Sequence, residues 1–119
     1  MNVRTINTYE ISVTDPQRAW RFYHEVFDLP DAVLTNGLET VSVAGKNVIF
    51  RQVPAHDTHV DLDHPDLILR ARDRINDLIN HLQNYYVPIV AGPTPEDDLQ
   101  AIFVNDYEGN LIKILERAK

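Results

Sequence analysis

The chain has 119 residues, of which 44% are hydrophobic and 24% charged, a composition typical of one folded domain with a sizeable core. Its formal net charge is −7 and it shows no basic patch, which argues against nucleic acid as a partner. Cysteine is absent, so disulfides, thiolate metal sites and a cysteine nucleophile are excluded. No apolar run approaches the ~20 residues that span a bilayer, and the N-terminus lacks a signal-peptide pattern, so we expect a cytoplasmic protein without a membrane partner.

The first half of the chain predicts a strand, a helix and three further strands. Residues 5–13 alternate between apolar and polar side chains, as a strand with one polar face does. Asp15 and Pro16 begin a helix as N-cap and first helical residue, and an apolar stripe that includes Trp20 and Tyr23 is expected to face the core. Short apolar segments between turn residues then predict strands over 32–34, 39–44 and 47–53.

The second half repeats this order after a polar connecting loop. The predicted elements are a strand over 66–71, a helix with Asp73 as N-cap, strands over 87–90, 100–105 and 111–116, and a proline-containing loop over 92–98. The same number of residues separates the two N-caps, Asp15 and Asp73, and the two helix-ending prolines, Pro30 and Pro88. We therefore expect one domain, 1–119, made of a first module (about 1–53), a connecting loop (54–65) and a second module (66–119).

The last two predicted strands are joined by a turn over residues 106–110, where Gly109 can take a positive φ angle at little cost. Along the final strand Lys113 shares a face with Leu111 and Leu115. A lysine is almost never fully buried without a partner. We therefore expect Lys113 either to line a cavity or to form an ion pair.

Two modules of this kind in a chain of this length resemble the vicinal oxygen chelate superfamily, which includes glyoxalase I, bleomycin-resistance proteins, fosfomycin-resistance enzymes and extradiol dioxygenases. The resemblance implies an α+β fold in which two βαβββ modules form a cupped mixed sheet with helices on its outer face, and it implies a homodimer. The local sequences that carry it are Val13-Thr-Asp15 with Ala19-Trp-Arg-Phe-Tyr23, Glu25-Val-Phe-Asp-Leu29, and the closing hairpin Asp106-Tyr-Glu-Gly-Asn-Leu-Ile112.

Metal-containing members of this superfamily take their ligands from four inward-facing strand positions. The resemblance places these positions at Thr8, at Phe50 (or Arg51 if the register slips by one), at Asp66 and at Lys113, where Asn47 is aligned with Asn110. Only Asp66 is a good metal ligand, and a protonated lysine repels a cation. We therefore predict that the usual metal site is absent and that the protein has no cofactor.

The same mapping predicts a wall of mixed polarity inside the cup. In one interpretation Lys113 pairs with Asp66 or Glu10 and only maintains the structure; in another, the polar groups converge on a ligand pocket. In a third, Lys113 has a lowered pKa and acts as a base or amine nucleophile, which makes it the candidate catalytic residue. The predicted wall consists of Thr8, Glu10, Ser12, Phe50, Gln52, Asp66, Ile68, Arg70 and Lys113.

The connecting loop is rich in histidine and aspartate, which suit zinc or nickel. We interpret it as a solvated connector because its histidines, His56, His59 and His64, are irregularly spaced, and a metal site there stays an alternative.

The sequence as a whole predicts a metal-independent protein that binds a small organic molecule, similar in plan to the bleomycin-resistance proteins. One alternative is a metal-dependent lyase, isomerase or dioxygenase of the glyoxalase type, and the metal content separates it from the binder. A second alternative is a non-catalytic regulatory or scaffold module, which would lack a ligand pocket.

Overall fold

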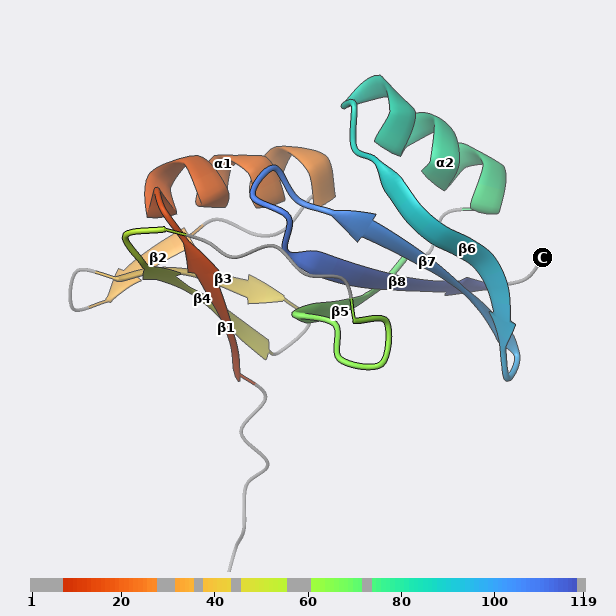
Figure 1. Cartoon of the computed structure of the whole chain (residues 1–119), viewed down its shortest axis with the longest axis horizontal. Coiled ribbons are helices and arrows are strands. Elements are labelled where there is room, and N and C mark those ends of the chain that lie inside the picture. The colour runs from red at the N-terminus through yellow and green to blue at the C-terminus, as the bar shows by residue number, and fades with distance from the viewer. Residues whose placement is uncertain are drawn as a thin grey trace, which may run out of the picture. The chain divides into compact units, whose positions relative to one another are not determined.

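The computed structural model of the chain describes residues 8–27, 32–35, 38–43, 46–55, 61–71 and 74–117. The chain divides into two units, Met1–His56 and Asp57–Lys119, and the boundary lies within the predicted connecting loop. Each unit contains one described helix and one four-stranded sheet (Figure 1). Neither described helix is long and apolar enough to cross a membrane.

The first unit has the predicted βαβββ order. Its elements are β1 (Thr8–Val13), α1 (Pro16–Phe27), β2 (Ala32–Thr35), β3 (Leu38–Val43) and β4 (Lys46–Gln52). The sheet order is β1-β4-β3-β2, with β1 parallel to β4 and the other neighbours antiparallel. The predicted N-cap is confirmed, because the backbone N–H of Arg18 donates to Oδ1 of Asp15 at 3.3 Å.

The second unit has the same order of elements and strands, which confirms the predicted α+β fold of two βαβββ modules. Its elements are β5 (Leu67–Arg70), α2 (Ile75–Asn84), β6 (Ile89–Glu96), β7 (Leu99–Asn105) and β8 (Leu111–Arg117). The sheet order is β5-β8-β7-β6, with β5 parallel to β8. The N-cap of α2 is Arg74, which makes no side-chain capping bond, and the predicted cap Asp73 lies outside the described residues.

The predicted loop over residues 92–98 is wrong, because β6 continues through Pro93 and Pro95 as far as Glu96. This strand is the outer strand of its sheet, and its pairing with β7 shifts register on both sides of Ala91. Proline removes a backbone donor, which a sheet tolerates at an edge or at a bulge. The edge position and the register shifts thus explain why two prolines do not end this strand.

The core of the first unit lies between its sheet and α1. Phe50 and Tyr23 are fully buried, and their rings meet edge to face with centroids 5.1 Å apart. Ile11 and Val13 of β1 are buried on the same face. Trp20, predicted to be core, is only partly buried and stacks on His24 with ring centroids 5.6 Å apart.

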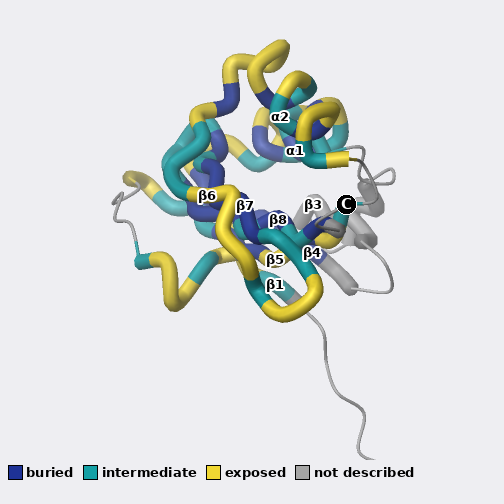
Figure 2. The backbone as a smooth tube through the Cα atoms, turned by 90° about the vertical axis from the view of Figure 1, so that its right-hand side faces the viewer, coloured by how far each residue is buried: buried dark blue, intermediate teal, exposed yellow. Residues whose placement is uncertain are grey.

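The second unit buries both faces of its central strands. Ile102, Ile112 and Ile114 are buried on one face of the sheet, and Ala101, Phe103 and Leu111 form a buried cluster on the other. Buried, dark-blue stretches of β7 and β8 are visible in Figure 2. Residues on β7 and β8 therefore pack on both sides, unlike those of β1, where the side chain of Glu10 is exposed.

The closing turn between β7 and β8 is organised by Asp106, which is buried. Its Oδ1 accepts hydrogen bonds from the backbone N–H groups of Glu108 at 2.9 Å and Asn110 at 2.8 Å, and its Oδ2 accepts one from Nδ2 of Asn110 at 2.9 Å. Gly109 has a φ of 89°, as the sequence predicts. The turn is thus held by side chains and fixes where β8 begins.

Candidate ligand-binding site

Lys113 lies in the middle of a three-strand row in the second sheet. The register pairs it with Ile68 on β5 and with Phe103 on β7, so the three side chains share one face. We call this surface the Lys113 face. By the same register it comprises Ile68, Arg70, Ala101, Phe103, Asn105, Leu111, Lys113 and Leu115.

The charged end of Lys113 is held by Glu96 of β6. Nζ donates to Oε1 of Glu96 at 2.6 Å and lies 5.7 Å from the centroid of the Phe103 ring. The side chain of Lys113 is 16% exposed and that of Glu96 is 42% exposed. The sequence predicts an ion pair for Lys113, but the predicted partners, Asp66 and Glu10, are wrong.

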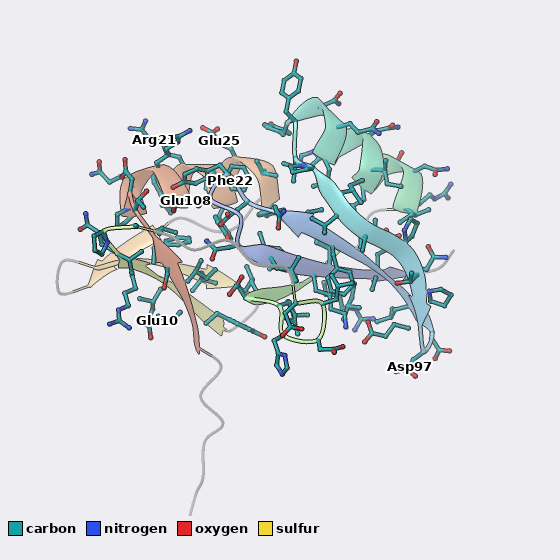
Figure 3. All side chains as sticks on the ribbon, viewed as in Figure 1. Glu10, Arg21, Phe22, Glu25, Asp97 and Glu108 are labelled. Carbon is teal, nitrogen blue, oxygen red and sulfur yellow. The ribbon has the colours of Figure 1, made fainter. Side chains whose placement is uncertain are left out.

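Those two carboxylates have other partners. Oδ2 of Asp66 accepts the backbone N–H of Leu111 at 2.7 Å, and the Asp66 N–H donates to the Leu111 carbonyl at 2.8 Å, so Asp66 ties the start of β5 to β8. Oε1 of Glu10 accepts a hydrogen bond from Nη1 of Arg51 at 3.3 Å in the first unit. Figure 3 shows Glu10 on the side of the first sheet away from α1.

Phe50 and Gln52 do not share a face with Glu10 and Ser12, so this part of the predicted wall is wrong. The parallel register of β1 and β4 pairs Phe50 with Ile11 and Arg51 with Ser12. Successive side chains of a strand point to opposite faces, so Phe50 enters the core while Arg51 joins the face of Glu10 and Ser12. The strand pairing thus agrees with the alternative register, slipped by one residue, in which Arg51 rather than Phe50 lies on the face of Glu10 and Ser12.

The other described residues of the predicted wall lie on the predicted strand face within their own unit. Ser12 lies with Glu10 in the first unit, and Ile68 and Arg70 lie with Lys113 in the second. Thr8 begins β1, but its side chain lies outside the described residues.

The rest of the Lys113 face is mostly apolar. Leu115, Val90 and Ala91 pack against the buried cluster of Ala101, Phe103 and Leu111. Ile68, on the edge strand β5, is 38% exposed. Few polar atoms on an apolar surface are typical of small-molecule sites.

Asn105 adds one polar atom to this face. Its Oδ1 is buried and has no hydrogen-bond partner among the described residues. A buried acceptor without a partner is energetically costly, and a donor on a bound molecule would satisfy it.

Across the described residues, no group of three or more His, Asp or Glu side chains lies close enough together to hold a metal ion. Of the four strand positions that the resemblance maps to family ligands, those on β4 and β8 carry Arg51 and Lys113, whose positive charges repel a metal cation. Arg51 and Lys113 are therefore poor ligands for a divalent metal.

In the connecting loop, His56, Asp57 and His59 lie outside the described residues. Nδ1 of His64 lies 2.9 Å from Oδ2 of Asp61, and this hydrogen bond and the charge of Asp61 raise the pKa of His64. The backbone N–H of Asp63 donates to the other Asp61 oxygen at 3.1 Å. Asp61 thus organises the described part of the loop.

Sequence reasoning missed Glu96, because the prolines before it suggested a loop. Asp97 is at the tip of the β6–β7 hairpin in Figure 3, so Glu96 is the last strand residue before the turn. The available signal was the alternation of Thr94 and Glu96, which places both on the Lys113 face once the strand is extended.

A model of the Glyoxalase/Bleomycin resistance protein/Dioxygenase superfamily matches residues 5–114 of the chain. No curated protein matches the chain.

Solved structures share the fold over almost the whole chain. The virulence protein STM3117 from Salmonella typhimurium has a TM-score of 0.76 and 22% identity, covering 99% of this chain and 100% of that one. TnmS3, an antibiotic binding protein from Streptomyces sp. CB03234, has a TM-score of 0.74 and 18% identity, covering 99% of both chains. A glyoxalase/bleomycin resistance protein/dioxygenase from Alicyclobacillus acidocaldarius has a TM-score of 0.72 and 14% identity, covering 97% of this chain and 92% of that one. At these identities the likeness shows the fold.

Proposed function

We propose a function for this chain from one premise: it belongs to the glyoxalase/bleomycin resistance protein/dioxygenase superfamily. The proposed function is the binding of a small organic molecule, without a metal, on the Lys113 face of the second sheet. A homodimer and a cytoplasmic location are part of this proposal, from the family resemblance and the absence of cysteine.

The position of Lys113 carries the proposal. Its ammonium group lies over the ring of Phe103 on a mostly apolar face, and 16% of the side chain is exposed. An ammonium has three N–H donors, and among the described residues only Glu96 accepts from it. Removing a charge from water is costly unless its hydrogen bonds are replaced, so a ligand that supplies a further acceptor would stabilise this arrangement.

Two further observations support a binding role. Oδ1 of Asn105, on the same face, is buried and has no hydrogen-bond partner among the described residues. The solved structure of TnmS3, with the same fold, is that of an antibiotic binding protein. The presence of cations, Arg51 and Lys113, at two of the four positions that the resemblance maps to metal ligands supports binding without a metal.

The test combines elemental analysis with ligand titration. Purified, tag-free protein is expected to contain no stoichiometric metal after gel filtration, even after incubation with nickel, zinc, iron or manganese. A panel of small aromatic compounds is then titrated into the native protein and into Lys113→Met, with Arg51→Met as the matched control from the first unit. Arg51 is a cation on β4, the strand of the first sheet that corresponds to β8 in the second, and its ion-pair partner, Glu10, is exposed.

Binding that Lys113→Met weakens and Arg51→Met leaves intact would support the proposal. One tightly held metal per chain would overturn it and place the glyoxalase-type enzyme first. Binding that is insensitive to Lys113→Met would move the site away from this face.

A further inference from the structure

Two cations and two apolar side chains alternate on neighbouring strands of the Lys113 face. On β5, Ile68 is followed two residues later by Arg70; on β8, Lys113 is followed two residues later by Leu115. The parallel register sets Ile68 beside Lys113 and Arg70 beside Leu115. The cations thus occupy one diagonal of this four-residue patch, and the apolar side chains occupy the other.

The two cations share one face, but their charged ends point apart, because the ammonium of Lys113 is hydrogen-bonded to Glu96 across β7 while Arg70 lies on β5, on the other side of β8. Neighbouring strands are about 4.8 Å apart and residues two apart in one strand about 6.6 Å, so the Cα atoms on the diagonal are about 8 Å apart. Both long side chains can reach an acidic group placed between these two positions once Lys113 exchanges Glu96 for that group.

Arg70 has no acidic partner in the part of the chain that the structure describes. Its side chain is exposed, and the carboxylate on its own strand, Asp66, lies four residues away, or about 13 Å in an extended strand. That carboxylate accepts the backbone N–H of Leu111. Glu96, the other carboxylate of this face, is hydrogen-bonded to Lys113. The patch therefore has an unmatched positive charge in a chain whose formal net charge is −7.

From this arrangement we propose that the ligand of the Lys113 face is an organic anion: its acidic group is bound by Arg70 and Lys113, and its apolar body lies on Ile68 and Leu115. This inference rests on the proposed binding function and adds the charge of the ligand. Arginine binds carboxylate, sulfonate and phosphate oxygens through two parallel N–H groups, which suits it to the primary contact. Lysine contributes a point charge, for which Glu96 competes with the acidic group of the ligand.

The test uses three probes that share one ring system and differ in charge: naphthalene carboxylate, naphthalene methanol and naphthalene methylammonium. Each is titrated into the native full-length protein at low ionic strength, with probe fluorescence and calorimetry as the two readouts. We expect the carboxylate to bind about tenfold more tightly than the neutral alcohol and the ammonium to bind least, with a preference that decreases as salt is added.

Two variants locate the acidic group, and a third serves as control. Arg70→Gln is expected to abolish most of the preference for the carboxylate while leaving the binding of the alcohol unchanged. Glu96→Gln removes a competing carboxylate from Lys113 and is expected to tighten binding of the anion severalfold. Arg51→Gln makes the same charge change on an exposed arginine of the first unit and is expected to change neither.

The outcomes separate this inference from the function on which it rests. If the alcohol or the ammonium binds as tightly as the carboxylate, or if Arg70→Gln leaves the preference intact, the anion inference is overturned while the binding site stands. If none of the three probes binds the folded protein, the binding site is overturned as well.

Discussion

Lys113 and Glu96 form their ion pair across an intervening strand. Lys113 is on β8 and Glu96 on β6, and β7 lies between them in the sheet order. The lysine therefore reaches over the ring of Phe103, its neighbour on β7, to meet the carboxylate. This contact joins the edge strand to the centre of the sheet in addition to the backbone ladder.

Replacing Lys113 by Met is expected to change the free energy of unfolding by less than about 1 kcal/mol. The Glu96 side chain is 42% exposed, so it can be hydrated once its partner is gone, and methionine keeps the apolar contact with Phe103. Chemical denaturation of Lys113→Met, Glu96→Gln and the double variant measures the coupling between the two residues. A loss of ~3–5 kcal/mol in Lys113→Met would instead mean that the pair behaves as a fully buried one.

Phe50→Ala is expected to destabilise the chain by about 3–5 kcal/mol, the usual range for removing a fully buried aromatic side chain. The edge-to-face contact with Tyr23 is lost together with the buried area. Ile49→Ala is the matched control, because Ile49 precedes Phe50 on β4, faces the opposite side and is only partly buried. Equal losses of unfolding free energy in the two variants would contradict the register of β1 and β4.

Asp106→Ala is expected to lower the free energy of unfolding by about 2–4 kcal/mol, because it leaves buried N–H donors of the closing turn without an acceptor. Asp106→Asn keeps one carbonyl oxygen and should lose less. Asp98→Ala, a change at an exposed aspartate of the β6–β7 turn, is the control and should stay near the native value. In thermal melts, we expect the melting temperature to rise from Asp106→Ala to Asp106→Asn to the native protein. A melting temperature of Asp106→Ala equal to that of the control would refute this prediction.

His64 is expected to titrate above its ordinary pKa of 6.5, because Asp61 accepts its hydrogen bond and favours the protonated ring. A raised pKa in the folded state means that the pair contributes stability below pH 6.5 and loses that contribution as the pH rises through the pKa of the folded protein. The imidazole signals followed by NMR should therefore shift at a lower pH in Asp61→Asn than in the native protein. An unchanged midpoint would show that Asp61 does not control His64.

Much of the fold can be predicted from short sequence patterns, and the structure contains the features that these patterns predict. Asp15 and Pro16 begin α1 where capping chemistry predicts, and Gly109 takes its positive φ in the closing turn. Each of these depends on a few neighbouring residues, so a single sequence is enough to find it.

The site depends on information that local patterns do not contain. The alternation in β4 defines two faces, but packing against Tyr23 decides which face enters the core. Matching the sequence around Asn47 to that around Asn110 therefore assigns Phe50 to the face that Arg51 occupies, an error of one residue. Likewise, the partner of Lys113 is decided by the length of an edge strand that prolines made to look like a loop. Both errors concern a contact between residues that are far apart in the sequence: Phe50 with Tyr23, and Lys113 with Glu96.

The prolines of β6 also bear on how this sheet edge can meet another copy of the chain. A free sheet edge invites another chain to extend it through backbone hydrogen bonds. On β6, Pro93 and Pro95 present no N–H, and the register shifts around Ala91 interrupt the regular spacing that an added strand requires. This edge is therefore poorly suited to fibril growth, and two copies that associate on this side of the second unit would have to do so through side chains.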